Sequence, residues 1–240
     1  AIFVPVHFER YSKASRRFMD LLCSISNVIE PLGIDEAFLD VSGVTEDYDA
    51  ARELARQLKQ QVSEELELVA SVGVAPSKTV AKVASDHDKP DGLIIVRPGE
   101  EAVFLAPLDI RVLPGVGPKT ALALHDIGIE TLGQLAEVSD DLISRKLGRY
   151  GPVLKRRAQG VDTSKVEPRG EPKSMSRETT FGTDTRDLAF LEETIHSMCR
   201  RLANDLRMHQ KHAATITVKL RYEDFETITL QRSLRMDTSE

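Results

Sequence analysis

The sequence predicts an α+β protein in three parts. Strand-like and helix-like segments alternate over residues 1–106, which predicts a mixed first part. Residues 107–160 read as short helices separated by Gly and Pro, which predicts a small all-helical second part. A strand, a helix and two strands follow over 174–240, and this order begins a ferredoxin-like unit.

In the first part, the apolar spacing predicts three helices and three strands. A β-rich run over 66–74 is expected to be a central strand, and Ser77 is a candidate N-cap for the helix that follows. In chain order, the expected elements are a helix over 11–26, a strand over 34–40, a helix over 48–65, the strand over 66–74, a helix over 77–85 and a strand over 92–96.

Between the second and third parts, residues 161–173 are charged, contain Pro168 and Pro172 and lack an apolar period. This composition is typical of an inter-domain tether. The third part is expected to contain a strand over 174–181, a helix over 188–209 and strands over 213–222 and 225–234.

Composition excludes several classes of protein. The chain has 240 residues, which is long enough to bury a hydrophobic core without disulfides or structural metal ions. Its two cysteines, Cys23 and Cys199, form no Cys-x-x-Cys motif, which favours a reducing compartment and argues against structural zinc. No apolar run reaches membrane-spanning length and no signal peptide opens the chain, so we expect a soluble, cytoplasmic protein.

The formal net charge of -6 argues against nucleic-acid binding until its distribution is considered. The first third is acidic, whereas the second part ends in a basic run. The run contains Arg145, Lys146, Arg149, Lys155, Arg156 and Arg157. Such a run can bind phosphates or can simply be a solvated face.

Two adjacent carboxylates, Asp35 and Glu36, lie in an apolar strand-like segment. In a strand they must point to opposite faces, so one of them needs a counter-charge. Mg²⁺ fits, because it takes one or two carboxylates and fills its remaining positions with water and substrate phosphates. The alternative is a tight turn in which both acids face water.

The second part contains Leu113-Pro114-Gly115-Val116-Gly117-Pro118-Lys119, the layout of a helix-hairpin-helix. Gly115 and Gly117 let the backbone approach a phosphate, the next helix offers its first N–H groups, and Lys119 adds a positive charge. Such a hairpin grips duplex without reading bases. The alternative is an ordinary Gly-Pro turn between packed helices.

Two further lysines are candidates for binding DNA phosphates. Lys78 and Lys82 are four residues apart and share one face of the predicted helix. The alternative is a pair of solvated lysines. The loop before them is not a nucleotide-binding P-loop, because Ser77 stands where that motif requires Gly and the loop is one residue short.

Together these motifs resemble the Y-family of translesion DNA polymerases, in its DinB or polymerase IV branch. The resemblance rests on residues 33–43, 71–78, 81–85 and 89–92 and on the hairpin at Pro114, in the family's order and spacing. It covers nearly the whole chain. It implies a palm with a mixed sheet over 1–106, a helix-hairpin-helix thumb over 107–160, a linker over 161–173 and a partial little finger over 174–240.

The resemblance also implies an activity and its residues. The activity is template-directed addition of deoxynucleotides to a primer 3′ end opposite damaged DNA, by two-metal phosphoryl transfer. Asp35 and Glu36 would hold two Mg²⁺ ions, and Lys89 would contact the incoming triphosphate. Gly115, Val116, Gly117 and Lys119 would bind the primer-side duplex. Arg177 would contact the template backbone, or else form a rim salt bridge.

The sequence departs from the family pattern in one respect that matters for activity. The initial Asp-x-Asp strand and the fingers of the family are absent, and the little finger is incomplete at Glu240. We therefore expect a polymerase fragment that is inactive by itself, because a metal-binding carboxylate is missing.

Two alternatives stay open beside the polymerase, namely a non-catalytic DNA-binding derivative of one and another palm-type nucleotidyl enzyme. The expected partners are primer-template DNA and a deoxynucleoside triphosphate, with a sliding clamp as a further candidate. We expect a monomer.

Overall fold

The protein is described by a computed structural model that covers residues 2–168 and 170–238. The chain divides into two compact units, Ala1–Arg169 and Gly170–Glu240. The first unit contains the expected first and second parts and most of the tether. None of the described helices is long and apolar enough to cross a membrane.

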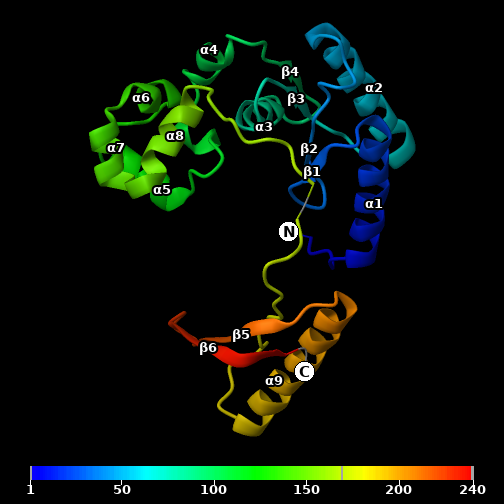
Figure 1. Cartoon of the computed structure of the whole chain (residues 1–240), viewed down its shortest axis with the longest axis vertical. Helices are drawn as coiled ribbons and strands as arrows, with labels where there is room; N and C mark the ends of the chain where they lie inside the picture. Colours follow the sequence, from blue (N-terminus) through cyan, green and yellow to red (C-terminus); the bar gives the residue numbers. More distant parts are fainter. Residues whose placement is uncertain (1, 169, 239–240) are drawn as a thin grey trace. The chain divides into compact units, whose positions relative to one another are not determined.

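The first unit alternates helices and short strands before it becomes helical (Figure 1). Its mixed half contains α1 Phe8–Ile25, β1 Ile29–Pro31, β2 Ala37–Leu39, α2 Tyr48–Leu66, β3 Val72–Val74, α3 Lys78–His87, β4 Leu93–Ile95 and α4 Glu101–Leu105. Its helical half contains η1 Ile110–Val112, α5 Pro118–His125, α6 Leu132–Glu137, α7 Asp140–Leu147, η2 Gly148–Tyr150 and α8 Gly151–Ala158.

The strands of this unit form two separate two-stranded sheets. β1 and β2 are antiparallel, with Glu30 opposite Phe38, and β3 and β4 are parallel, with Gly73 opposite Ile94. β3 packs against both α2 and α3. A Cβ on Gly73 would lie 2.1 Å from the Ala81 carbonyl oxygen, so only glycine lets this strand lie so close to α3.

The predicted helices of the first part are confirmed, with Ser77 accepting a hydrogen bond from the Val80 N–H at the start of α3. Two strand predictions were too long. The strand predicted over 66–74 is confined to β3, because Glu67 ends α2 in a left-handed conformation with φ 55°. The strand predicted over 34–40 begins only at Ala37, since the chain is still turning back from β1 at the two residues before it.

One hydrophobic core runs through the mixed and helical halves of the first unit. It joins Val80 and Val83 of α3 to Leu105 of α4 and to Leu124 of α5. Each such side chain contributes about 1.5–3 kcal/mol when it leaves water. The core also includes Ala84, Val96, Ile110, Leu113, Val116, Ala121, Ile129, Leu132, Leu135, Ile143, Leu154 and Ala158. The helical half is therefore fixed to α3 by shared packing.

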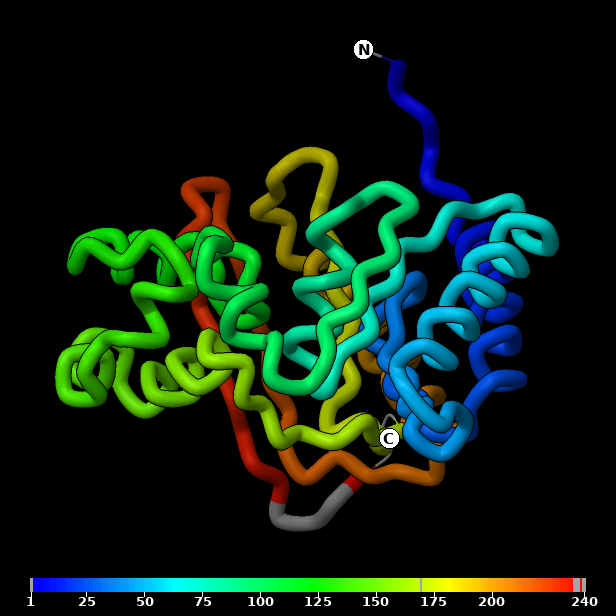
Figure 2. Tube along the Cα trace, turned by 90° about the horizontal axis from the view of Figure 1, so that it is seen from above, coloured from blue at the N-terminus to red at the C-terminus, as the bar shows by residue number. Residues whose placement is uncertain are grey.

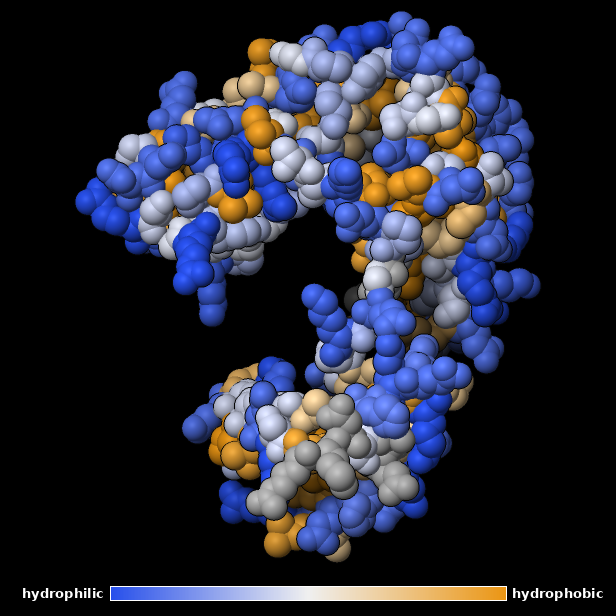
Figure 3. Space-filling view, in the orientation of Figure 1, coloured by the Kyte–Doolittle hydropathy of each residue, from blue (hydrophilic) through white to orange (hydrophobic). Residues whose placement is uncertain are grey.

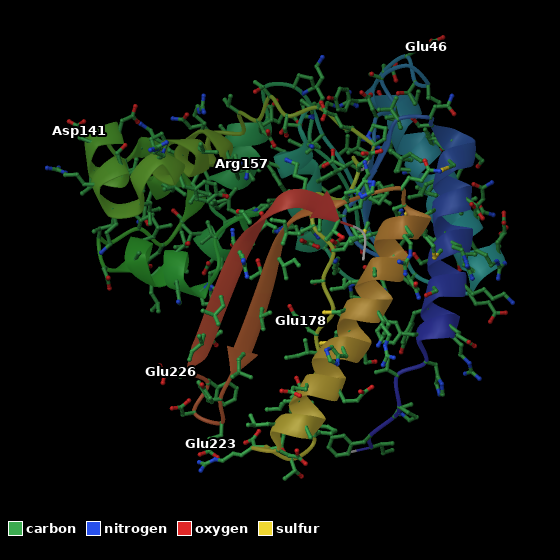
Figure 4. The ribbon with its side chains drawn as sticks, turned by 60° about the horizontal axis from the view of Figure 1, so that its bottom comes forward. Glu46, Asp141, Arg157, Glu178, Glu223 and Glu226 are labelled. Carbon is green, nitrogen blue, oxygen red and sulfur yellow. The ribbon has the colours of Figure 1, made fainter. Side chains whose placement is uncertain are left out.

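Two groups of helices lie at opposite ends of this unit. α1 and α2 lie side by side, and α5 to α8 gather at the other end in both views (Figures 1 and 2). On α7, Asp141 projects away from its neighbours (Figure 4). The face of the chain in Figure 3 is mostly hydrophilic, with smaller hydrophobic patches between the hydrophilic residues. Large apolar residues are also exposed at the start of the chain, among them Phe3 and Phe8.

The second unit consists of α9 Leu188–Met208 and the antiparallel strands β5 Ala213–Arg221 and β6 Thr227–Thr238. These three elements confirm the predicted helix and the two predicted strands. Val218 pairs with Leu230, and Glu223 and Glu226 mark the turn between the strands (Figure 4).

The strand predicted over 174–181 was wrong. That segment has no assigned secondary structure and joins no ladder in the described part of the chain. A period-two pattern specifies side chains that alternate between two faces, and it does not supply the neighbouring strand that an extended segment needs for hydrogen bonding.

Candidate active site and nucleic-acid interface

The predicted carboxylate pair lies in the turn between β1 and β2. Asp35 is in a bend and exposed, and Glu36 is the last residue before β2. The Leu32 and Gly33 N–H groups both donate to the Glu36 carbonyl, at 2.9 and 3.3 Å, which closes the turn. The prediction that the two acids point to opposite faces of a strand was therefore wrong. Here the turn geometry, and not strand alternation, sets their directions.

The side chain of Glu36 meets charged side chains of α3 and of the loop after it. Lys82 Nζ lies 2.6 Å from Glu36 Oε1 and 2.9 Å from Asp86 Oδ2. Lys89 Nζ lies 2.7 Å from Asp86 Oδ1 and 4.0 Å from Glu36 Oε1. These four residues, Glu36, Lys82, Asp86 and Lys89, form a closed ring of alternating charges, which we call the charge quartet.

Two members of the quartet, Lys82 and Asp86, are stabilised in their charged forms. Burial disfavours the Lys82 ammonium, but hydrogen bonds to Glu36 and Asp86 outweigh it and raise the pKa of Lys82. Burial likewise disfavours the Asp86 carboxylate, but hydrogen bonds from Lys89 and Lys82 outweigh it and lower the pKa of Asp86. The charged forms of Lys82 and Asp86 are therefore favoured by their shared ion pair.

Lys78 belongs to a different ion pair, one turn earlier on α3. Its Nζ lies 2.7 Å from Glu30 Oε2 in β1 and 5.7 Å from the centre of the Phe38 ring. The same Glu30 oxygen accepts a hydrogen bond from the Glu167 N–H at 3.0 Å. The side chains of Lys78 and Lys82 are only 16% and 22% exposed, so the interpretation of both as solvated lysines was wrong.

The donor set at the turn suits a hard divalent cation. Asp35 and Glu36 offer carboxylate oxygens, the ligands that Mg²⁺ prefers, and Glu36 already holds a cation in the form of the Lys82 ammonium. Within the described part of the chain, no hydrogen bond or ion pair engages the Asp35 carboxylate. The nearby Asp40 is occupied, because Ser42 donates to it twice and lowers its pKa.

Only two carboxylates are available at this turn. Among the described residues, no group of three or more His, Cys, Asp and Glu side chains could hold a metal ion. The residues therefore fit part of a Mg²⁺ site, in which Glu36 would exchange its lysine partner for the ion.

The predicted hairpin forms between η1 and α5. Gly115 has φ +98°, and a Cβ there would lie 2.1 Å from the Tyr150 hydroxyl. Val116 is 8% exposed and its N–H donates to the Leu113 carbonyl at 2.9 Å, so it anchors the turn in the core. Gly115 is required by the fold itself.

Gly117 and Lys119 face outward from the same turn. Gly117 is the N-cap of α5 without a side-chain cap, Pro118 is the first helical residue, and a Cβ on Gly117 would meet nothing within 4 Å. Lys119 is exposed in the first turn. The positive end of α5 is thus open to an anion, with a lysine beside it.

The basic run is partly neutralised within its own unit. Lys146 pairs with Asp126 at 3.2 Å and Lys155 pairs with Asp140 at 2.6 Å. In the second unit, Arg177 forms an ion pair with Asp205 of α9. The rim salt bridge is thus present for Arg177, and its contact with DNA stays a prediction.

Sequence reasoning missed Asp86, Glu30 and Asp162. The spacing of Asp86 from Lys82, by four residues, carried a signal, because such neighbours meet on a helix surface. Asp162 accepts hydrogen bonds from the Thr79 N–H at 3.3 Å and the Thr79 hydroxyl at 2.6 Å. No local pattern indicates that contact, which spans 83 residues.

Comparison with known proteins agrees with this architecture. The profile of the impB/mucB/samB family matches residues 1–86, its C-terminal domain matches 172–240, and a SAM-like helix-hairpin-helix tandem matches 108–148. DNA polymerase IV of Dehalococcoides mccartyi strain 195 is 42% identical over 98% of this chain and 60% of its own length. DNA polymerase IV of Methanoculleus marisnigri is 44% identical, over the whole chain and 66% of its own length.

A solved structure decides the family. A Y-family DNA polymerase chimera superposes with a TM-score of 0.88 and 31% identity, over 99% of this chain and 68% of its own. The chain belongs to the Y-family of DNA polymerases, in its DinB-like branch. It spans about 60% of the length of the Dehalococcoides relative. The helix-hairpin-helix of this Y-family chain is confirmed by the tandem that matches it.

Proposed function

We propose that this chain is part of a template-directed DNA polymerase of the translesion type, which adds deoxynucleotides to a primer 3′ end opposite damaged DNA. Membership of the Y-family supports the reaction class. The observation that carries the proposal is the charge quartet beside the Asp35–Glu36 turn. In it, an oxygen of Glu36, the candidate metal ligand, lies 4.0 Å from the ammonium of Lys89, the candidate phosphate-binding group.

In this proposal the acidic residues bind metal and the lysines bind phosphate. Asp35 and Glu36 would hold Mg²⁺, two ions being expected in the complete enzyme. When bound, Mg²⁺ activates the primer 3′ hydroxyl and neutralises triphosphate charge during in-line displacement. Lys89 is the more exposed lysine of the quartet, with 52% of its side chain accessible, which supports it as the residue that would contact the triphosphate. Lys78 and Lys82, at 16% and 22%, support the turn and the phosphates beside it.

The hairpin would hold duplex DNA by its backbone. Gly115 and Val116 shape the turn, whereas Gly117 and Lys119 meet the phosphate, at the start of α5. Arg177 would contact the template backbone from the second unit. The partners are thus primer-template DNA and a deoxynucleoside triphosphate. We further propose a cytoplasmic monomer, with a sliding clamp as a candidate partner, which sedimentation with and without clamp would test.

The metal and nucleotide site is tested by thermal unfolding. With a deoxynucleoside triphosphate present, adding Mg²⁺ should raise the melting temperature of the wild-type chain more than that of Asp35→Ala or Glu36→Ala, because a ligand stabilises only the state that binds it. Glu46→Ala is the control, since Glu46 lies on an exposed loop before α2. Equal shifts in all four proteins would contradict the assignment.

A second function is a non-catalytic DNA-binding protein derived from such a polymerase. It is favoured by one observation, the lack of a third metal-binding group near the carboxylates in the described residues. In that case the hairpin still binds duplex DNA, and Mg²⁺ with nucleotide leaves the melting temperature unchanged in every variant. The same unfolding experiment, combined with a DNA-binding measurement, separates the two functions.

A further inference from the structure

We propose that Lys82 is the counter-cation that Glu36 keeps while no divalent cation is bound, and that Asp86 is the acceptor that keeps Lys82 when one binds. This inference rests on the proposed metal site at Glu36. It assigns Asp86 as a positioning residue, which acts on metal binding through Lys82.

The first step is the position of the Lys82 ammonium. It is 2.6 Å from a Glu36 oxygen and also contacts both oxygens of Asp86, at 2.9 and 3.1 Å. An ammonium has three donors, so it can bind both carboxylates at once and can release one without losing the other. The exchange requires no movement of α3, which carries both Lys82 and Asp86.

The second step is burial. The Lys82 side chain is 22% exposed, whereas those of Glu36 and Asp86 are 39% and 38% exposed. A largely covered ammonium that loses its carboxylate is left without compensation, because little water can reach it. Asp86 removes that penalty, so Glu36 can give up its lysine at a small cost. A cation arriving from solvent meets Glu36 at its exposed side.

The third step is the role of Lys89. Its Nζ is 2.7 Å from the Asp86 carboxylate, which also binds Lys82. One acid therefore holds both lysines. When Glu36 turns to a metal, both ammonium groups remain beside Asp86. They then lie next to the bound cation, where a phosphate oxygen would need them.

The experiment measures Mn²⁺ binding to the chain from the loss of the aqueous Mn²⁺ signal in electron paramagnetic resonance. Lys82→Met should bind Mn²⁺ about fivefold more tightly than wild type, because Glu36 no longer has a competing cation. Asp86→Asn should bind it about threefold more weakly, because Lys82 is then confined to Glu36. In the double variant, Asp86→Asn should have no further effect.

The matched control is Lys59→Met. Lys59 lies on α2, its side chain is 15% exposed, and it forms an ion pair with Asp91 at 2.8 Å, outside the quartet and the turn. Its Mn²⁺ affinity should stay within about twofold of wild type. Melting temperatures without metal show that each variant is folded before its affinity is compared.

The outcomes separate this inference from the proposed function. If Glu36→Ala binds Mn²⁺ as well as wild type does, the metal site itself is wrong. If Glu36→Ala weakens binding but Lys82→Met does not tighten it, Lys82 is no competitor of the metal. If Asp86→Asn weakens binding equally with and without Lys82, Asp86 acts by its charge alone and the exchange is overturned.

Discussion

The hairpin at 113–125 and the charge quartet are both candidate binding sites, but different forces hold them. The hairpin is fixed from within, by Leu113 and Leu124 in the core and by the left-handed backbone at Gly115. The quartet lies at the surface and is held by ion pairs among its own side chains, which are 22% to 52% exposed. A backbone site needs a rigid support, whereas a metal and phosphate site needs partners that can be exchanged.

Because of this difference, substitutions in the hairpin and in the quartet should affect different properties of the protein. Exposed ion pairs add about 0.2–1 kcal/mol each, whereas a buried leucine contributes several times as much. Substitutions inside the hairpin should therefore affect folding first. Substitutions in the quartet should affect ligands first.

The largest effect is expected at the buried side of the hairpin. Leu124 is 0% exposed, and Leu124→Ala should lower the free energy of unfolding by about 3 kcal/mol, through lost burial and a cavity. Urea denaturation measures this value. The control is Leu122→Ala on the same helix, where the side chain is 66% exposed and the loss should be below about 0.5 kcal/mol. Similar losses at both positions would show that α5 is not anchored by this core.

The next effect concerns the left-handed residue of the hairpin. Gly115→Ala should destabilise the chain by about 1–2 kcal/mol, because φ is +98° and the new Cβ displaces Tyr150. Gly117→Ala is the matched variant, since its φ of -82° suits any residue and its Cβ meets nothing. Calorimetric melting should separate the two. An unchanged melting temperature in Gly115→Ala would mean that the turn can adopt another conformation.

A third effect appears in binding and not in folding. Gly117→Val should weaken duplex binding about tenfold, equally across sequences, because it blocks a backbone approach to phosphate. Lys119→Ala should also weaken binding and reduce the slope of log affinity against log salt by about one unit. Fluorescence anisotropy at several salt concentrations measures both. Arg52→Ala on α2 is the control, and an equal loss in that variant would point to non-specific charge attraction.

The smallest effect tests the contact between the segment after α8 and the start of α3, the helix that carries Lys82 and Asp86. Asp162, just after α8, accepts two hydrogen bonds from Thr79 at the start of α3. Burial opposes its ionisation, but hydrogen bonds from Thr79 and Ser164 outweigh it and lower the pKa of Asp162 below 3.8. A lowered folded pKa gives stability that is present above 3.8 and is lost as pH falls through the folded pKa.

Asp162→Asn should therefore cost about 1 kcal/mol at pH 7, and this difference from wild type should shrink below pH ~4. Urea denaturation between pH 3 and pH 7 measures it. A difference that does not change with pH would show that the contact acts through shape and not through charge.

Much of the secondary structure could be predicted from the sequence. The apolar spacing identified α1, α2 and α9, and Ser77 marked the start of α3. The predicted elements failed where a turn or a neighbouring strand decided the outcome. Glu36 was predicted to lie in a strand, but it ends a turn. Residues 174–181 were predicted to form a strand, but they pair with no strand in the described part of the chain.

The sequence by itself determined the hairpin, because glycine, proline and a helix start act over a few residues. It also determined which residues carry charge at the candidate site, Asp35 and Glu36 among them. Only the tertiary structure decided how those charges are paired. Lys82 meets Glu36 across 46 residues and Thr79 meets Asp162 across 83, and such distances are closed by the packing of α3 and not by any local pattern.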